Sequence, residues 1–290
     1  MSYVWFGLVC TIWGSSFILM KRAAGGLSPL SIGAGRVLFG AAILLLVLCW
    51  LRQPRGFRWK DAGSLFGIVV TGFAWPYCVQ PELISRHGSA FIGMSVGFTP
   101  LLTLGISVIA LGTIPTARQV IGVAGALVCL CVLMWDGWQR AVPSTDLLLA
   151  FSVPLTYAIA NNWIRRSMTH VPPIELTFLC LLGSGVLLLP LAWVMPARAA
   201  TTASWEVAWG SVALLGVVGT GFATCLFNRL IQEEGPLFAA MVTNLVPLFA
   251  MAWGFADAEQ ISLRQLIAVM GVLLMVLLVQ YGSAKKAAQG

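Results

Sequence analysis

The chain has 290 residues, of which 59% are hydrophobic and 9% are charged. A soluble domain of this length could not cover its surface with so few charged side chains, so the composition excludes a water-soluble globular protein. The net charge of +7 comes from Lys and Arg residues near the ends of apolar segments. The sequence has no basic stripe with interleaved aromatic residues, so it does not indicate binding to nucleic acid.

Ten apolar runs are each about long enough to cross the hydrocarbon core of a bilayer as a helix, which needs about 20 residues. In chain order they cover residues 3–20, 30–51, 63–82, 89–111, 118–136, 146–164, 174–195, 207–228, 236–256 and 265–282. Their length excludes a membrane β-barrel, and helices are the other structure that satisfies the backbone in lipid. The predicted fold class is all-α integral membrane, with ten transmembrane helices.

The first five spans carry polar and aromatic side chains at membrane depth, where such residues are rare. The candidate cavity residues here are Trp13, Ser16, Trp75, Tyr77, Gln80, Ser95 and Thr99. Arg36 is the basic residue clearly inside a span. We favour snorkelling of its side chain to the outer interface, and the functional alternative is a counter-charge for a substrate carboxylate at the cavity mouth. Pro100 should bend the fourth span.

The last five spans repeat this pattern. Their candidate cavity residues are Tyr157, Asn161, Trp163, Asn228 and Asn244. Pro247 lies in the ninth span as Pro100 lies in the fourth. A proline near the middle of each span is either a fixed kink or a hinge about which half-helices move during transport.

The two halves of the chain also share short motifs. Thr71-Gly72-Phe73-Ala74 recurs as Thr220-Gly221-Phe222-Ala223, and Pro29 and Pro173 each open a span. These matches give a period near 145 residues and predict two five-helix repeats, residues 1–140 and 141–290. Because each repeat has an odd number of crossings, the second is inverted relative to the first, as in many secondary transporters.

The polar candidates gather on spans 1, 3, 4, 6, 8 and 9, which predicts a central cavity lined by those six helices. Its amides, hydroxyls and aromatic rings suit a zwitterion or a small polar organic molecule. All ten acidic residues lie in loops or at span ends, which favours uniport-like or weakly coupled flux over proton exchange. The seven cysteines form no CxxC pair, so neither a disulfide framework nor a metal site is expected.

The distribution of Lys and Arg predicts the orientation of the chain. With a cytoplasmic N-terminus, the inner segments hold ten basic residues and the outer segments hold six, and Arg52, Arg55, Arg58 and Lys60 form the strongest anchor. We therefore expect a multi-pass protein of a bacterial inner membrane with both termini in the cytoplasm.

Several of these motifs together resemble a known family. Trp13-Gly14-Ser15-Ser16 with Lys21, then Pro29 and Arg36, and then the spans that contain Pro100 and Pro247, are similar to the EamA-type exporters of the drug/metabolite transporter superfamily. The resemblance implies a ten-helix secondary transporter with a central cavity between the repeats. Many members export amino acids or related metabolites, and aromatic amino acid exporters are the relatives to test first. The first half lacks the Glu that often follows the fourth helix, since Gly112-Thr113 stands there.

The leading hypothesis is thus a secondary transporter that exports amino acids, including aromatic ones, or similar small metabolites by alternating access. The alternative is a multidrug or quaternary-cation exporter, which should contain an embedded carboxylate. A non-transporting scaffold or an intramembrane enzyme is a further alternative, although no catalytic motif such as HExxH or GxSxG is present. The expected partners are a small-molecule substrate and the lipid bilayer, with no cofactor. Sequence does not decide between a monomer and a homodimer.

Overall fold

The computed structural model describes residues 1–52, 55–87, 89–138, 142–194, 205–246, 248–249, 267–268 and 270–279, and these contain helices and no strand. The first half forms α1 (Ser2–Ala24), α2 (Pro29–Leu51), the 3₁₀ turn η1 (Trp59–Asp61), α3 (Ala62–Val69), the π-helix η2 (Val70–Ala74), α4 (Trp75–His87), α5 (Ser89–Val96), α6 (Thr99–Leu111) and α7 (Ala117–Trp138). The second half forms α8 (Ser144–Ser167), α9 (Pro173–Val194), α10 (Trp205–Leu214), the π-helix η3 (Leu215–Phe222), α11 (Ala223–Glu234), α12 (Pro236–Ala240) and an apolar helix at Met270–Val279.

Six of the helical stretches are long and apolar enough to cross a membrane. They are Ser2–Ala24, Pro29–Leu51, Trp59–His87, Ser144–Ser167, Pro173–Val194 and Trp205–Glu234. Four shorter apolar helices, Thr99–Leu111, Ala117–Cys129, Pro236–Val246 and Met270–Val279, lie within the other four predicted spans. Large apolar side chains also cover the outer surface, where Ile109 is 88% and Trp193 89% exposed. A surface of this kind fits lipid rather than water, so the chain is a multi-pass membrane protein.

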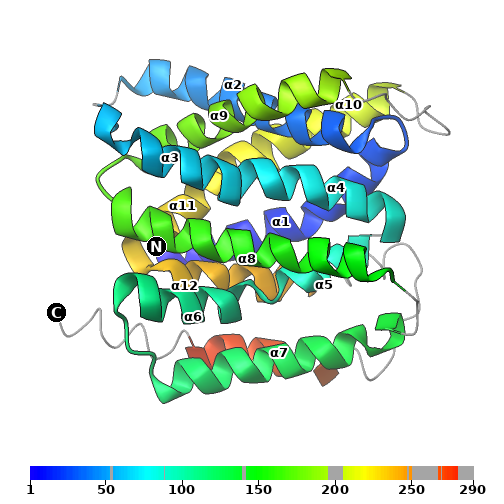
Figure 1. Cartoon of the computed structure of the whole chain (residues 1–290), viewed down its shortest axis with the longest axis vertical. Coiled ribbons are helices and arrows are strands. Elements are labelled where there is room, and N and C mark those ends of the chain that lie inside the picture. The colour runs from blue at the N-terminus through cyan, green and yellow to red at the C-terminus, as the bar shows by residue number, and fades with distance from the viewer. Residues whose placement is uncertain are drawn as a thin grey trace.

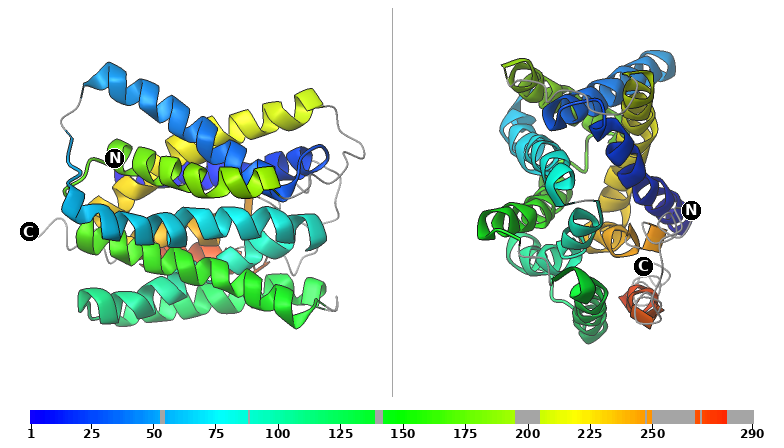
Figure 2. Two further views of the ribbon diagram at one scale, coloured as in Figure 1. Left: turned by 45° about the horizontal axis from the view of Figure 1, so that its top comes forward. Right: turned by 90° about the vertical axis from the view of Figure 1, so that its right-hand side faces the viewer.

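Helices from the two halves pack against one another across the bundle. The helices lie roughly parallel or antiparallel in one layered bundle (Figure 1), and the end-on view of Figure 2 shows α1, α2 and α10 next to each other. In this bundle α2 packs on α9 and η3, α1 packs on α10 and α11, and α8 packs on α4 and α6. The buried apolar residues form two clusters, and each cluster combines residues from both halves.

Local sequence sets several helix ends. Ser28 caps α2, because its side chain accepts a hydrogen bond from the backbone N–H of Ser31 at 3.2 Å, and Pro29 occupies the first turn. Proline is favoured there because its missing N–H would have no helical partner. Gly112 ends α6 and Gly235 ends α11, each with a positive φ (64° and 100°) that favours glycine.

The fourth predicted span is broken into two helices. α5 stops at Val96, a turn follows at Gly97 and Phe98, and α6 begins at Thr99 with Pro100 in its first turn. Pro100 therefore starts a new helix, where its ring fits, and does not bend a continuous one. Pro247, the matching residue of the second half, lies outside the described residues.

Both copies of the Thr-Gly-Phe-Ala motif form π-helix. Thr71–Ala74 lie within η2, and Thr220–Phe222 lie at the end of η3. The π-helix is rare and is found mostly as short segments near functional sites. Short π-helical segments thus occur at matching sequence positions of the two halves, an irregularity that hydropathy does not predict.

Candidate functional site

A cavity lies in the middle of the bundle. Its lining is formed by Trp13, Ser16, Phe17, Met20, Arg36, Gly72, Phe73, Tyr77, Gln80, Val96, Thr99, Tyr157, Ala160, Asn161, Ile164, Thr224, Phe227, Asn228, Thr243 and Val246. These residues come from α1, α2, η2, α4, α5, α6, α8, α11 and the segment after α12. The cavity volume is about 80 Å³. At roughly 10–15 Å³ for each water on this measure, the cavity has room for about six waters.

Nine of the predicted site residues line the cavity, namely Trp13, Ser16, Arg36, Tyr77, Gln80, Thr99, Tyr157, Asn161 and Asn228. Four predicted residues do not line it: Trp75, Ser95, Trp163 and Asn244. The six predicted lining spans all contribute residues, and Arg36 adds the second span.

Two tryptophans lie outside the cavity because each has a different partner. Trp75 is 40% exposed, and its indole N–H donates to Ser152 Oγ at 2.8 Å. The ring of Trp163 packs on Gly67, where any Cβ would collide with it. Gly67 thus provides the space that this ring fills on α3, which turns Trp163 away from the cavity.

The side chains of the other two residues, Ser95 and Asn244, contact residues three positions earlier in the chain. Ser95 Oγ donates to the carbonyl oxygen of Ile92 at 2.9 Å, which keeps the side chain against α5. Asn244 is buried and its amide lies 3.9 Å from Met241 Sδ. In this conformation neither side chain faces the cavity.

Arg36 requires a correction to the sequence interpretation. We favoured snorkelling to the interface, but the residue is only 4% exposed and lines the central cavity. Its Nε donates to Thr220 Oγ1 at 2.9 Å, and its guanidinium lies 4.2 Å from the centroid of the Tyr77 ring. Gly33, one turn earlier, lets α2 approach the Tyr77 carbonyl closely, so the arginine reaches inward over the ring and not along lipid.

Thr220 was not among the predicted site residues. It is fully buried in η3, and its hydroxyl both accepts from Arg36 and donates to the carbonyl oxygen of Leu215 at 3.1 Å. The neighbouring carbonyl of Gly219 accepts the indole N–H of Trp13 at 2.9 Å. The π-helix thus supplies two anchor points for cavity residues. The sequence signal was present, because Thr220 opens the repeated tetrapeptide.

Two polar atoms at the cavity wall have no hydrogen-bond partner in the described part of the chain: Asn161 Nδ2 and Thr224 Oγ1. Buried polar groups are normally satisfied, so such atoms indicate an absent water or ligand. The adjacent Asn162 differs, since it accepts from Ser107 at 2.6 Å and donates to the carbonyls of Thr103 and Ala158. Of this pair, Asn162 holds helices together and Asn161 faces the cavity.

The other polar residues of the lining are fixed by side-chain hydrogen bonds. The amide of Gln80 donates to the hydroxyl of Tyr157 at 3.1 Å, which links α4 to α8. The amide of Asn228 donates to Thr177 Oγ1 at 2.9 Å, which links α11 to α9. These bonds cross between helices, and the cavity is therefore held in a defined shape.

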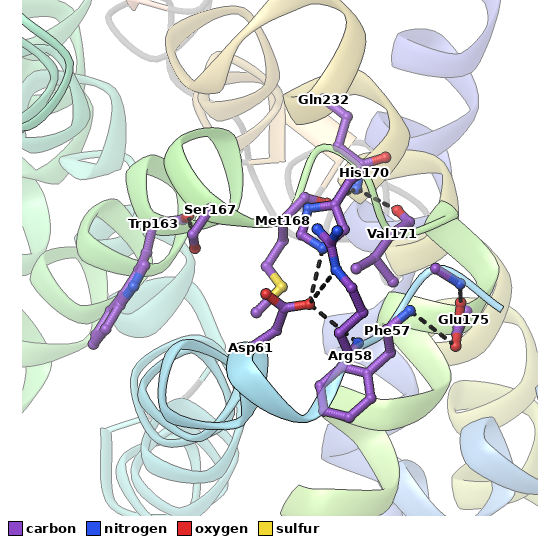
Figure 3. A network of polar contacts seen from close by, with 11 residues as sticks. Phe57, Arg58, Asp61, Trp163, Ser167, Met168, His170, Val171, Glu175 and Gln232 are labelled. Atoms are coloured by element: carbon purple, nitrogen blue, oxygen red, sulfur yellow. Dashed lines mark hydrogen bonds and ion pairs between the residues drawn. The ribbon is translucent and has the colours of Figure 1, made fainter.

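A polar network lies around Asp61, His170 and Glu175 (Figure 3). Asp61 Oδ2 lies 2.9 Å from His170 Nε2, and Glu175 accepts the backbone N–H of Gly56 at 2.6 Å. The amide of Gln232 donates to two carbonyls of the α8–α9 loop, at 2.9 and 3.0 Å. The network joins the segment before α3, the α8–α9 loop and the end of α11. Met168, whose carbonyl is one of the two acceptors of Gln232, lies one helical turn after the cavity residue Ile164.

A second cluster lies at the opposite ends of α4 and α8. Asp146, in the first turn of α8, lies 2.7 Å from His87 Nε2 and 3.1 Å from Arg86 Nη1. A carboxylate–imidazole pair thus lies at each end of the helical stretch Trp59–His87, with Asp61 paired to His170 after the end of α8 and His87 paired to Asp146 at its start. Within the described ranges, no group of three or more His, Cys, Asp or Glu residues could hold a metal ion.

Comparison with known proteins gives a consistent family assignment. The model of the EamA-like transporter family matches the chain twice, at residues 1–135 and 145–281. The uncharacterized transporter YyaM of Bacillus subtilis is 25% identical over 91% of this chain and 88% of the relative. An S-adenosylmethionine/S-adenosylhomocysteine transporter of Chlamydia muridarum is 22% identical over 84% of this chain and 80% of that protein. A crystal structure with 16% identity has a TM-score of 0.77 over 98% of both chains, which shows a shared fold.

Proposed function

The chain belongs to the EamA-like transporter family, and we propose that it is a secondary transporter that exports amino acids or similar small metabolites across a bacterial inner membrane. The observation that carries the proposal is the central cavity, whose wall combines aromatic rings with the unpartnered polar atoms of Asn161 and Thr224. Small-molecule sites typically have this composition, with apolar walls and a few polar groups that fix orientation.

We further propose that residues 1–140 and 141–290 are inverted repeats that move relative to each other. The family model matches once in each half, and both copies of the repeated tetrapeptide form π-helix. Helices of both halves line the cavity, so a rocking motion between them would expose it to one side and then the other. The helix break before Pro100 and the matching Pro247 are the proposed hinges.

The proposed orientation places both termini in the cytoplasm. Segments that the basic-residue rule predicts to be inside come together at one end of the bundle: Ser2 donates to Glu234 at 2.6 Å, and Asp61 meets His170. The His87–Asp146 pair lies at the other end, as expected for two outer segments. In this proposal the network of Figure 3 is the cytoplasmic seal of the cavity.

The alternative functions predict other features. A quaternary-cation exporter needs a carboxylate in its cavity, and none of the lining residues in the described part of the chain is Asp or Glu. A non-transporting scaffold has no use for buried polar atoms that lack partners, because each such atom costs about 1–3 kcal/mol.

Solute counterflow in proteoliposomes tests the proposal. The proteoliposomes are loaded with an unlabelled solute and labelled solute is added outside, for amino acids and related carboxylic acids tested one at a time. We expect saturable counterflow for at least one of them, a large loss in Asn161→Leu, and retention in Trp75→Phe, which changes an aromatic residue outside the cavity. Absence of counterflow for the whole panel, with correctly folded protein, contradicts the proposal.

A further inference from the structure

Among the described residues of its lining, the cavity carries one formal charge, and it is positive. This charge is that of Arg36, and the other lining residues in the described ranges are neutral. We propose that the cavity selects organic anions: molecules with one carboxylate, a net charge of minus one and an apolar or aromatic body. This inference rests on the proposed function. It narrows the substrate class from amino acids and similar metabolites to carboxylic acids that lack an ammonium group.

The contacts of Arg36 with residues that the structure describes leave its charge uncompensated. Its hydrogen-bond partners among the described residues are the neutral Thr220 Oγ1 and Met20 Sδ, the latter a weak acceptor at 3.5 Å. None of the ion pairs in the described part of the chain includes Arg36. A lone buried charge is costly in a membrane interior, and an anion in the cavity offsets that cost.

The guanidinium is also positioned in advance. Tyr77 supports it from one face at 4.2 Å, and Thr220 fixes Nε. A guanidinium has several N–H donors in one plane, and a carboxylate accepts two of them side by side. Nε is bound to Thr220 and one N–H of Nη1 points at Met20 Sδ, so the remaining N–H groups of the two terminal nitrogens are the ones available to such a group.

The other polar atoms of the wall favour the same chemistry. Asn161 Nδ2 is a donor without a partner, and Thr224 Oγ1 is a hydroxyl that can donate. Both suit the oxygen atoms of a carboxylate or carbonyl. An ammonium group is itself a donor, so Asn161 Nδ2 cannot bind it, and Arg36 repels it; a zwitterion therefore loses part of the gain and a cation loses all of it.

Aromatic side chains form much of the remaining wall, from Trp13, Phe73, Tyr77, Tyr157 and Phe227. Flat rings bury large apolar areas and pack well against another ring. The body of the anion is therefore predicted to be apolar or aromatic.

The charge belongs to one half of the chain. Arg36 stands seven residues after Pro29, and the residue seven places after Pro173 is Cys180. Cys180 is completely buried in the core of α9. Duplication of the fold has thus not duplicated the charge, and the structure assigns a single anion site to the cavity.

Three ligands with the same phenyl group but different charges test the inference. Binding of 3-phenylpropionate, phenylalanine and phenethylamine to the purified protein is measured by calorimetry and by ligand-induced thermal stabilisation. We expect the anion to bind at least tenfold more tightly than the cation, with the zwitterion between them. Equal affinities, tighter binding of the cation, or no binding of the anion overturns the inference.

Variants connect this order to the arginine. Arg36→Gln should remove the preference for the anion, whereas Arg22→Gln, the same change at an exposed position of α1, should leave it unchanged. If Arg36→Gln does not fold, Arg36→Lys and Thr220→Val serve instead, and each should weaken binding of the anion several-fold. An unaltered charge order in folded variants overturns the inference.

The outcomes separate this inference from the proposed function. Saturable counterflow without a preference for anions would leave the transporter proposal standing and overturn the charge selectivity. Selective binding of the anion without counterflow of any solute would uphold the site and contradict the transporter proposal.

Discussion

The hydroxyl of Thr220 is the group through which the π-helix η3 holds Arg36, and its removal has a calculable effect. Thr220→Val replaces the hydroxyl by a methyl group of similar size. The change deletes the 2.9 Å bond from Arg36 and the 3.1 Å bond to the Leu215 carbonyl. A hydrogen bond to a charged partner contributes about 1.5–3 kcal/mol. Water in the cavity can recover part of that loss for the guanidinium, so we expect a destabilisation of about 2 kcal/mol.

The repeat provides a matched control for this prediction. Thr71 occupies the same place in the first copy of the motif, but its hydroxyl donates to Gly67 of its own helix at 2.7 Å. Thr71→Val should cost less than about 0.5 kcal/mol, because bonds of this kind do not stabilise a helix.

Thermal unfolding in one detergent at a fixed scan rate measures the difference between the two variants. At roughly 2 °C per kcal/mol for a large chain, the apparent Tm should fall by about 4 °C for Thr220→Val and by about 1 °C or less for Thr71→Val. Equal shifts for the two variants would refute the reasoning, because they would show that the bond to Arg36 does not contribute to stability.

Three further predictions follow from side chains whose partners are known. Glu175→Gln should destabilise the protein by about 1–3 kcal/mol, since its carboxylate accepts two backbone N–H groups, and limited proteolysis of the loop after α2 should become faster. Gly67→Leu should lower the apparent Tm by several degrees because of the Trp163 ring, while Gly63→Leu, with open space at its Cβ, should change it little; similar effects of both would contradict the packing. Asn161→Leu should keep or raise thermal stability and abolish counterflow, whereas Asn162→Leu should cost about 2–4 kcal/mol because three hydrogen bonds are lost. The opposite ranking of the two asparagine variants would show that their roles have been exchanged.

Sequence patterns predicted the helical class, and most of the predicted site residues line the cavity. Apolar runs of membrane length have few alternatives in lipid, so the helical class follows from hydropathy. Polar residues at membrane depth are rare enough that Gln80, Tyr157 and Asn228, for example, could be assigned to the cavity from their location in a span. The family resemblance is confirmed by the two matches of the EamA-like family model.

Side-chain direction was the part that sequence did not supply. Trp163 lies two residues after Asn161, and a helix turns by more than half a circle over two residues, so the two cannot face the same cavity. The predicted site included both. Asn161 lines the cavity, and Trp163 fills the space over Gly67.

The environment of Arg36 also could not be predicted from composition. Snorkelling is the ordinary behaviour of an arginine near the end of a transmembrane helix. It is overridden here because Gly33 brings α2 close to Tyr77, and because the π-helix presents Thr220 to the guanidinium. Both causes depend on contacts between segments far apart in the chain, which a single sequence does not reveal.

The central claim is a cavity between two moving halves that opens to each side of the membrane in turn. It is tested most directly by thiol labelling of Asn161→Cys in a variant whose seven native cysteines have been replaced. A membrane-impermeant reagent is added to either face of oriented proteoliposomes. The account predicts labelling from both faces, slowed by 3-phenylpropionate. Labelling from neither face, or from one face only, would contradict it.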